Sequence, residues 1–225
     1  MKHAKNARHR PPAPHVPDGL DAGARELVAR DPDLARIVAA HGLPRFPRRN
    51  PDFPTLLHII LEQQLSVDVA AKLWARLKAR CRPLTPRRFL KLDLATLKRC
   101  GFTRQKAGYA RGLARAILER RFALARLKTL ADEDAMAALI ALKGFGRWSA
   151  EVYLLFALGR PDIWPAEDLA LRIAVQWLKN LPERPDGAYV RALGETWRPW
   201  RSVAACMLWQ SYLHRLDRAE RAPPL

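Results

Sequence analysis

The sequence is poor in cysteine and has no long apolar segment. It contains three cysteines, Cys81, Cys100 and Cys206, and no two of them are spaced like a metal-binding pair. This argues against a disulfide framework, a cysteine-rich zinc site and a four-cysteine iron–sulfur cluster. No run of about 20 apolar residues could span a membrane, and the basic first residues precede no apolar signal region. These absences predict a cytoplasmic protein, associated with the nucleoid if the source is bacterial.

Acidic residues are scarce relative to basic ones. The chain has 40 Lys and Arg against 22 Asp and Glu, which gives a net charge of +18. Such an imbalance favours a polyanionic partner, most simply nucleic acid. Residues 76–128 alone contain 17 Lys and Arg and two acids, Asp93 and Glu119. Because solvated helix faces usually mix charges of both signs, this segment predicts a surface that faces a polyanion.

Strand-like alternation is too short anywhere to build a sheet, whereas apolar residues recur at helical spacing from residue 18 onward. Helices are predicted over 22–41, 53–65, 67–80, 103–119, 132–142, 147–158, 168–180, 187–195 and 201–215. Proline and glycine separate these segments. Residues 1–17 hold four Lys and Arg, no acid and four prolines, which predicts a disordered basic arm. We therefore expect an all-α domain over residues 18–225.

Two glycines separate a pair of predicted helices in the sequence LKGFGRWSA at residues 142–150. Gly144 and Gly146 allow a tight turn, and Phe145 between them would fill the space between the helices. The free amides at the start of the second helix would form an anion site that suits a DNA phosphate. A Gly-x-Gly turn alone is equally typical of a simple helical connection.

Asp168 lies at the start of another predicted helix, 18 residues after Ala150. A carboxylate there is favoured by the helix dipole and the free amides of the first turn. On spacing alone the residue is therefore more readily interpreted as an N-cap than as a catalytic group.

Four segments in this order resemble the helix-hairpin-helix/Gly-Pro-Asp superfamily of DNA glycosylases, in its alkylation-repair branch, DNA-3-methyladenine glycosylase II. They are IILEQQLS at 59–66, GFTRQKA at 101–107, LKGFGRWSA at 142–150 with Asp168, and WRPWRSVAA at 197–205. The resemblance covers roughly residues 50–215. Four ordered segments are far more specific than one motif.

The resemblance implies a two-lobed, all-α fold with the active site between the lobes. The chain is too short for the N-terminal sheet domain of longer bacterial relatives, so we expect none. The implied function is a monofunctional DNA N-glycosylase in base excision repair. It would flip alkylated purines such as 3-methyladenine and 7-methylguanine out of duplex DNA and release them. We expect a monomer that binds damaged double-stranded DNA, without a membrane or an obligate protein partner.

The resemblance also assigns residues. Asp168 matches the catalytic aspartate. Trp148 stands where glycosylase/lyases place a Schiff-base lysine, so no lyase activity is expected. Trp148 and Trp209 match the aromatic walls of the base pocket, and Tyr153 is the aromatic nearest to a further pocket position, which Val152 occupies.

The remaining assignments concern DNA contacts. The implied DNA-binding hairpin consists of Lys143, Gly144, Phe145, Gly146, Arg147 and Ser149. The backbone carbonyls of Ile140, Leu142 and Phe145 match those that often hold a monovalent cation, Na⁺ or K⁺, and no other cofactor is expected. Gln64 or Leu65 would fill the gap left by the flipped nucleotide.

Other interpretations stay open at this point. A glycosylase for mismatched or oxidised bases shares the scaffold, although oxidised-base enzymes usually carry the lysine that is missing here. A non-catalytic DNA-binding module would explain the charge and the glycines. Either tryptophan is also compatible with a place in the core, and the glutamines are compatible with a buried turn between helices.

Overall fold

The computed structural model describes residues 20–44 and 48–221. The predicted basic arm, residues 1–17, lies outside the described residues. The helices are α1 (Leu20–Arg30), α2 (Pro32–His41), α3 (Phe53–Glu62), α4 (Val67–Arg80), α5 (Pro86–Phe89), α6 (Leu94–Arg99), α7 (Arg104–Leu118), α8 (Asp132–Ile140), α9 (Arg147–Phe156), α10 (Leu169–Leu178), α11 (Gly187–Gly194) and α12 (Arg201–Arg221), with 3₁₀ turns η1 (Leu124–Lys128) and η2 (Glu195–Trp197). No strand occurs in these ranges. The predicted all-α fold is confirmed.

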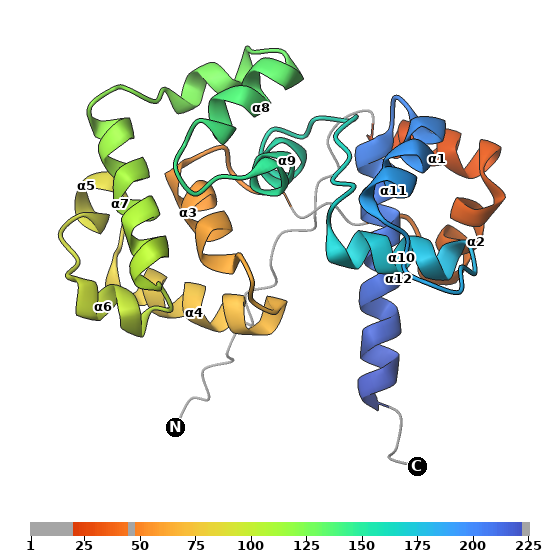
Figure 1. Ribbon diagram of the computed structural model, residues 1–225, viewed down its shortest axis with the longest axis horizontal. Coiled ribbons are helices and arrows are strands. Elements are labelled where there is room, and N and C mark those ends of the chain that lie inside the picture. The colour runs from red at the N-terminus through yellow and green to blue at the C-terminus, as the bar shows by residue number, and fades with distance from the viewer. Residues whose placement is uncertain (1–19, 45–47, 222–225) are drawn as a thin grey trace, which may run out of the picture.

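The helices form two lobes (Figure 1). Helices α3 to α9 make the first lobe, in which α3 packs against α4, α7 and α9. Helices α1, α2 and α10 to α12 make the second lobe, in which α12 packs against α1, α2 and α10. The second lobe thus joins the start of the described chain to its end. The connections from α2 to α3 and from α9 to α10 cross between the lobes.

The predicted helix over 22–41 is in fact two helices. Asp31 interrupts it as the N-cap of α2, and its Oδ1 accepts hydrogen bonds from the amides of Asp33 at 2.9 Å and Leu34 at 3.1 Å. Pro32 follows at the first position of α2, where the missing N–H costs nothing. Capping therefore outweighs the continuous apolar period across this junction.

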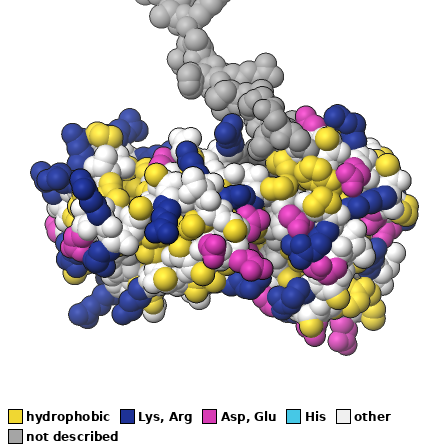
Figure 2. Space-filling model, turned by 90° about the horizontal axis from the view of Figure 1, so that it is seen from above, with side chains coloured by type: hydrophobic (Ala, Val, Ile, Leu, Met, Phe, Trp, Pro, Cys, Tyr) yellow, Lys and Arg dark blue, Asp and Glu magenta, His cyan; other side chains and the backbone are white. Residues whose placement is uncertain are grey.

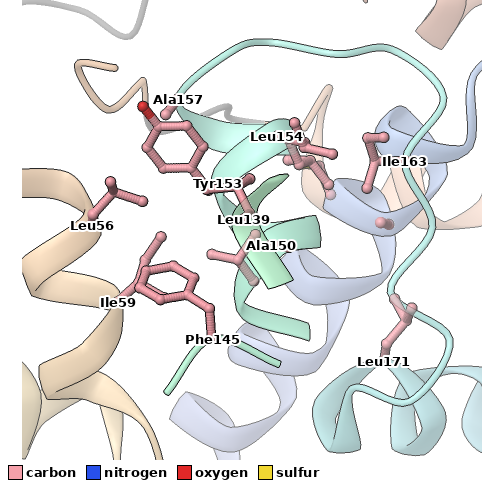
Figure 3. Close-up of a cluster of buried hydrophobic side chains, with 14 of the residues drawn as sticks. Leu56, Ile59, Leu139, Phe145, Ala150, Tyr153, Leu154, Ala157, Ile163 and Leu171 are labelled. Atoms are coloured by element: carbon pink, nitrogen blue, oxygen red, sulfur yellow. The ribbon is translucent and has the colours of Figure 1, made fainter. Parts of the chain in front are cut away.

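The core of the first lobe lies between α3, α8 and α9 (Figure 3). Leu56 and Ile59 of α3 face Phe145 and Tyr153, and all four side chains are buried. Phe145 belongs to the connection between α8 and α9, residues 141–146, which we call the hairpin. Its ring fills the interior and so fixes the hairpin to the lobe, as the glycine pattern predicted.

Candidate active site

The carboxylate of Asp168 lies where the two lobes meet. Its Oδ2 accepts a hydrogen bond from Nε1 of Trp148 in the first lobe at 2.7 Å. Its Oδ1 accepts one from Nε1 of Trp209 in the second lobe at 2.9 Å, and one from the amide of Leu171 at 2.8 Å. Three N–H donors thus converge on one carboxylate and complement its negative charge.

Asp168 is both a cap and a candidate catalytic residue. The bond to Leu171 makes it the N-cap of α10, so the N-cap interpretation of the sequence is correct as far as it goes. Capping does not require the two indoles, which come from α9 and α12. The aspartate therefore has a local role and a role between the lobes.

Both tryptophans keep part of their rings exposed. Trp148 and Trp209 are half-buried, whereas Trp197 is fully buried and belongs to the core. Trp209 stacks on Phe156, with ring centroids 5.5 Å apart and planes at 27°. Phe156 is a further aromatic residue beside this site, which the sequence analysis missed because only tertiary packing brings α9 and α12 together.

A charged side chain ties Phe156 to the end of α3. The guanidinium carbon of Arg49 lies 5.8 Å from the centroid of the Phe156 ring. Its two terminal nitrogens donate to the carboxylate of Glu62, at 2.8 and 3.1 Å. Glu62 is the last residue of α3. The wall formed by Trp209 and Phe156 is thereby connected to the turn that follows α3.

Tyr153 does not belong to the base pocket, and this assignment is corrected. Its side chain is fully buried among Leu56, Phe145 and their neighbours (Figure 3). It follows Trp148 by five residues on α9, which rotates it to another face of the helix. Val152 is buried as well. Burial also raises the pKa of the Tyr153 hydroxyl, which is consistent with a core position.

The hairpin presents backbone amides at the start of α9. Gly144 has φ +93° and Gly146 is the N-cap of α9, where no side chain caps the helix. Lys143 and Arg147 are exposed on either side of the turn. Free amides between two cations form an arrangement that suits an anion.

Ser149 lies in the first turn of α9, and its side chain contributes differently from the residues of the hairpin. Its side chain is buried, and its Oγ accepts a hydrogen bond from Nε2 of Gln63 at 3.0 Å. The same amide nitrogen donates to the carbonyl of Gly144 at 2.9 Å. The Ser149 side chain therefore supports the hairpin from within the protein, and its assignment as a DNA contact, which the resemblance gives to backbone amides, stays a prediction.

The turn between α3 and α4 is fastened to two other segments. Besides the bonds from Gln63 to the hairpin, Nζ of Lys106 donates to the carbonyls of Leu61 at 2.8 Å and Gln63 at 2.5 Å. Gln64 at the tip is exposed with φ +58°, and Leu65 is half-buried. The two candidate wedge residues therefore stand on a turn that Gln63 and Lys106 hold in place. The bond from Gln63 to backbone agrees with the alternative interpretation of the glutamines as part of a turn between helices, whereas the role of Lys106 was not predicted.

We expect Gln63→Glu to destabilise the protein by about 2 kcal/mol, since it removes two donated hydrogen bonds and sets a carboxylate against the Gly144 carbonyl. Urea unfolding measures the loss. Gln64→Glu is the matched control, because it adds the same charge at the exposed neighbouring residue and should leave stability within about 0.5 kcal/mol. Equal losses in both variants would contradict the bonding role of Gln63.

Glu151 is a buried acid beneath the hairpin. Its carboxylate accepts a hydrogen bond from Nε of Arg147 at 2.9 Å, and the Arg147 side chain is itself largely exposed. Burial raises the pKa of Glu151 to about 7, against the opposing effect of the positive charge on Arg147. The exposed cation at the start of α9 is thus paired with an acid that takes up a proton near neutral pH.

This acid predicts a pH-dependent contribution to stability. The pKa is higher in the folded state than the ordinary value of 4.5, so the folded protein binds the proton more tightly. The contribution is full below pH 4.5 and is lost as the pH rises through about 7, by about 3 kcal/mol at most. We expect the unfolding free energy of the wild type, relative to Glu151→Gln, to fall between pH 5 and pH 7.5. A difference that is constant with pH would contradict the assignment.

Other acids near Asp168 make no contact with the tryptophans. Glu167 is exposed and pairs with Arg191 at 2.8 Å.

Among the described residues no three His, Cys, Asp or Glu side chains are grouped as metal ligands require. In the same part of the chain, no helix has the length and apolar character needed to cross a membrane.

Comparison with known proteins agrees with this geometry. Residues 57–199 match the family model described as "HhH-GPD superfamily base excision DNA repair protein". DNA-3-methyladenine glycosylase 1 of Schizosaccharomyces pombe is 28% identical over 197 residues, which cover 86% of this chain and 83% of the relative. DNA-3-methyladenine glycosylase 2 of Escherichia coli is 30% identical, over 83% of this chain and 67% of the relative.

A solved structure supports the same grouping. The 3-methyladenine DNA glycosylase Mag1 of S. pombe, in complex with abasic DNA, superposes with a TM-score of 0.79 at 28% identity. The match covers 84% of this chain and 95% of that one. The similarity therefore includes both lobes and the residues between them.

Proposed function

Because the chain belongs to the HhH-GPD superfamily of base excision DNA repair proteins, we propose that it excises alkylated purines of the 3-methyladenine and 7-methylguanine type from duplex DNA. The observation that carries this proposal is the carboxylate of Asp168 between the indoles of Trp148 and Trp209. The relatives and the superposed structure, all 3-methyladenine glycosylases by name, support the alkylpurine class.

The aromatic residues account for recognition of the base. Alkylation at N3 or N7 gives a purine a positive charge, and a flipped cationic base gains stacking and cation–π attraction on an indole face. Trp148 and Trp209 supply such faces, and Phe156 behind Trp209 keeps that ring in place. Weak pairing of the damaged base lowers the cost of flipping and adds to selectivity.

The carboxylate accounts for the chemistry. Cleavage of the N-glycosidic bond gives the sugar oxocarbenium character, and the negative charge of Asp168 stabilises it. The same carboxylate orients the attacking water or accepts its proton. A base that is already cationic leaves without a general acid, so one carboxylate suffices where sugar hydrolases need two.

Trp148 also decides what the enzyme leaves behind. An indole cannot form an imine with the sugar aldehyde, and it stands in the position of the lyase lysine. The product is therefore an abasic site in an uncut strand.

The hairpin and the α3–α4 turn hold the DNA. The amides at the start of α9, with Lys143 and Arg147, bind phosphates of the damaged strand. Gln64 or Leu65 enters the stack from the minor groove and fills the place of the flipped nucleotide. Gln64 is the more exposed of the two.

A monovalent cation, Na⁺ or K⁺, fits the hairpin as a structural ion. Its ligands would be the carbonyls of Ile140, Leu142 and Phe145, a set of oxygens that suits a hard cation. The Leu142 carbonyl accepts one hydrogen bond, from the amide of Phe145 at 3.0 Å, and keeps a second lone pair. Such an ion would add positive charge near the bound phosphate.

We further propose that the enzyme acts in the cytoplasm as a monomer. Asp168, Trp148 and Trp209 all come from one chain, so the site needs no second subunit and no other protein partner. Damaged double-stranded DNA is its substrate.

The test is base release from methylated duplex DNA, with products separated by chromatography and strand scission scored with and without alkali. We expect 3-methyladenine or 7-methylguanine, with nicks only after alkali. Release of an oxidised or mismatched base instead would assign the same site to another lesion class. Binding without any release would mean a DNA-binding module.

A further inference from the structure

The excess positive charge of the described chain lies entirely in one part of the first lobe. Residues 67–131, which span α4 to η1, contain 18 Lys and Arg against three Asp and Glu. The other described residues contain 17 Lys and Arg against 18 Asp and Glu. The rest of the described chain, which includes Asp168, is therefore electrically balanced, and the segment 67–131 is not.

All the cations of this segment except Lys106 and Arg111 are exposed, and they form almost no ion pairs with acidic residues. The ion pair between Arg121 and Glu119 is the single one formed within residues 67–131. In the second lobe, by contrast, ion pairs are common, as between Lys179 and Asp33 at 2.6 Å. Figure 2 shows Lys and Arg side chains around the end of the first lobe, whereas the two signs of charge are interspersed over the second.

Three cations from two helices illustrate the concentration of positive charge in this segment. Arg76 and Arg80 of α4 and Arg99 of α6 are all exposed. Burial raises the pKa of the Cys100 thiol, and the positive charges of Arg80, Arg99 and Arg76 oppose that rise. The positive charges of three guanidinium groups from two helices therefore act on the same thiol. Like charges at this density repel one another unless a polyanion neutralises them.

We infer that this basic surface of residues 67–131 binds the phosphate backbone of duplex DNA flanking the lesion, on one side of the lesion only. The inference rests on the proposed function, which brings DNA to the hairpin. The hairpin and the first residue of α9 offer two exposed cations, Lys143 and Arg147, and Arg147 is already paired with Glu151. Since the described part of the second lobe is balanced in charge, it offers the other arm of the duplex no comparable excess of positive charge.

The surface suits a duplex better than a single strand. Proteins that hold single strands without sequence preference use exposed aromatic rings on which the bases stack. The exposed large apolar residues of the segment are aliphatic; they are Val67, Val69, Leu94 and Leu118. The rings of the segment are buried or half-buried, and Trp74 is already stacked on His58, with ring centroids 4.3 Å apart. A surface with many exposed cations and no fully exposed ring favours contacts with phosphates.

The experiment compares two duplexes of equal length that carry an abasic site near one end or near the other. Binding of the full chain is measured by fluorescence anisotropy over a range of salt concentrations. We expect one duplex to bind about tenfold tighter at low salt, because only its long arm reaches the basic surface. Equal affinities would overturn the inference.

Two variants with the same change in charge make the test specific. Arg80→Gln with Arg99→Gln should reduce the difference between the duplexes and lower the slope of log Kd against log salt by about two. Arg25→Gln with Arg184→Gln, on the second lobe, should change neither. An equal effect of both pairs of substitutions would overturn the inference. So would a ligand whose long arm is single-stranded, if that arm increased the affinity as much as the double-stranded arm does.

Base release from a short duplex separates this inference from the proposed function. If the enzyme excises alkylated bases and binds both duplexes equally, the inference about the basic surface is wrong and the proposed function is supported. If the affinities differ and no base is released from any duplex, the inference about the basic surface is supported and the proposed function is wrong.

Discussion

Asp168→Asn is expected to lower the single-turnover rate of base excision by at least about 1,000-fold, because it removes the negative charge that stabilises the sugar cation and acts on the water. Affinity for damaged duplex should stay within about threefold of the wild type, because the hairpin makes no contact with Asp168. Rapid-quench measurement of base release, with anisotropy on an abasic duplex, gives both quantities.

Asparagine is the informative replacement because Asp168 also caps α10. Asn accepts the hydrogen bond from the Leu171 amide as well as Asp does, whereas Asp168→Ala loses the cap and should cost about 1 kcal/mol of stability. Comparable excision by Asp168→Asn and the wild type would remove the aspartate from the mechanism. Loss of excision in the Ala variant only would reduce its role to the cap.

Gly144→Ala is expected to destabilise the protein by about 3 kcal/mol. Gly144 has φ +93°, which side chains rarely adopt, and an added Cβ would meet the ring of Tyr109 at 2.2 Å. The hairpin would have to move away from α7, so affinity for duplex DNA should fall as well. Chemical unfolding and anisotropy report the two losses.

Two companion variants separate the causes. Tyr109→Ala in the Gly144→Ala background relieves the clash and leaves the strain of the positive φ, so it should restore part of the affinity. Gly146→Ala is the control within the same turn, since its φ is −95° and no atom lies within 4 Å of an added Cβ. If Gly146→Ala were as damaging as Gly144→Ala, the contact with Tyr109 would not be the reason.

The helices and the hairpin followed from local rules. Apolar residues at helical spacing located nine segments, which the structure confirms within a few residues with two exceptions. A cap at Asp31 divides the first segment, and α12 continues beyond the predicted end at residue 215 to Arg221. The short helices α5 and α6 were missed because four and six residues are too few to establish a period.

Site residues that belong to a sequence motif were predicted, and those that only tertiary packing brings to the site were missed. Asp168 and Trp148 are 20 residues apart, and Trp209 lies 41 residues beyond the aspartate, so spacing alone could not show that all three meet. Tyr153 was assigned to the pocket as the nearest aromatic residue, but it follows Trp148 by five residues, which places it on the face of α9 that packs in the core. Gln63 and Lys106 donate hydrogen bonds to backbone carbonyls. Because every residue has such a carbonyl, the sequence does not indicate which of them are bonded.

The second lobe is built from both ends of the described chain, and this determines the order in which the two lobes can fold during synthesis. The first lobe consists of consecutive residues and has its full set of helices once α9 has left the ribosome. Helices α1 and α2 must wait for α12, as the hydrogen bond from Trp197 to Asp31 across 166 positions illustrates. Contacts of such long range form late. Because Trp209 arrives on that same last helix, we expect a nascent chain to form the first lobe with its hairpin before both indoles can meet at Asp168.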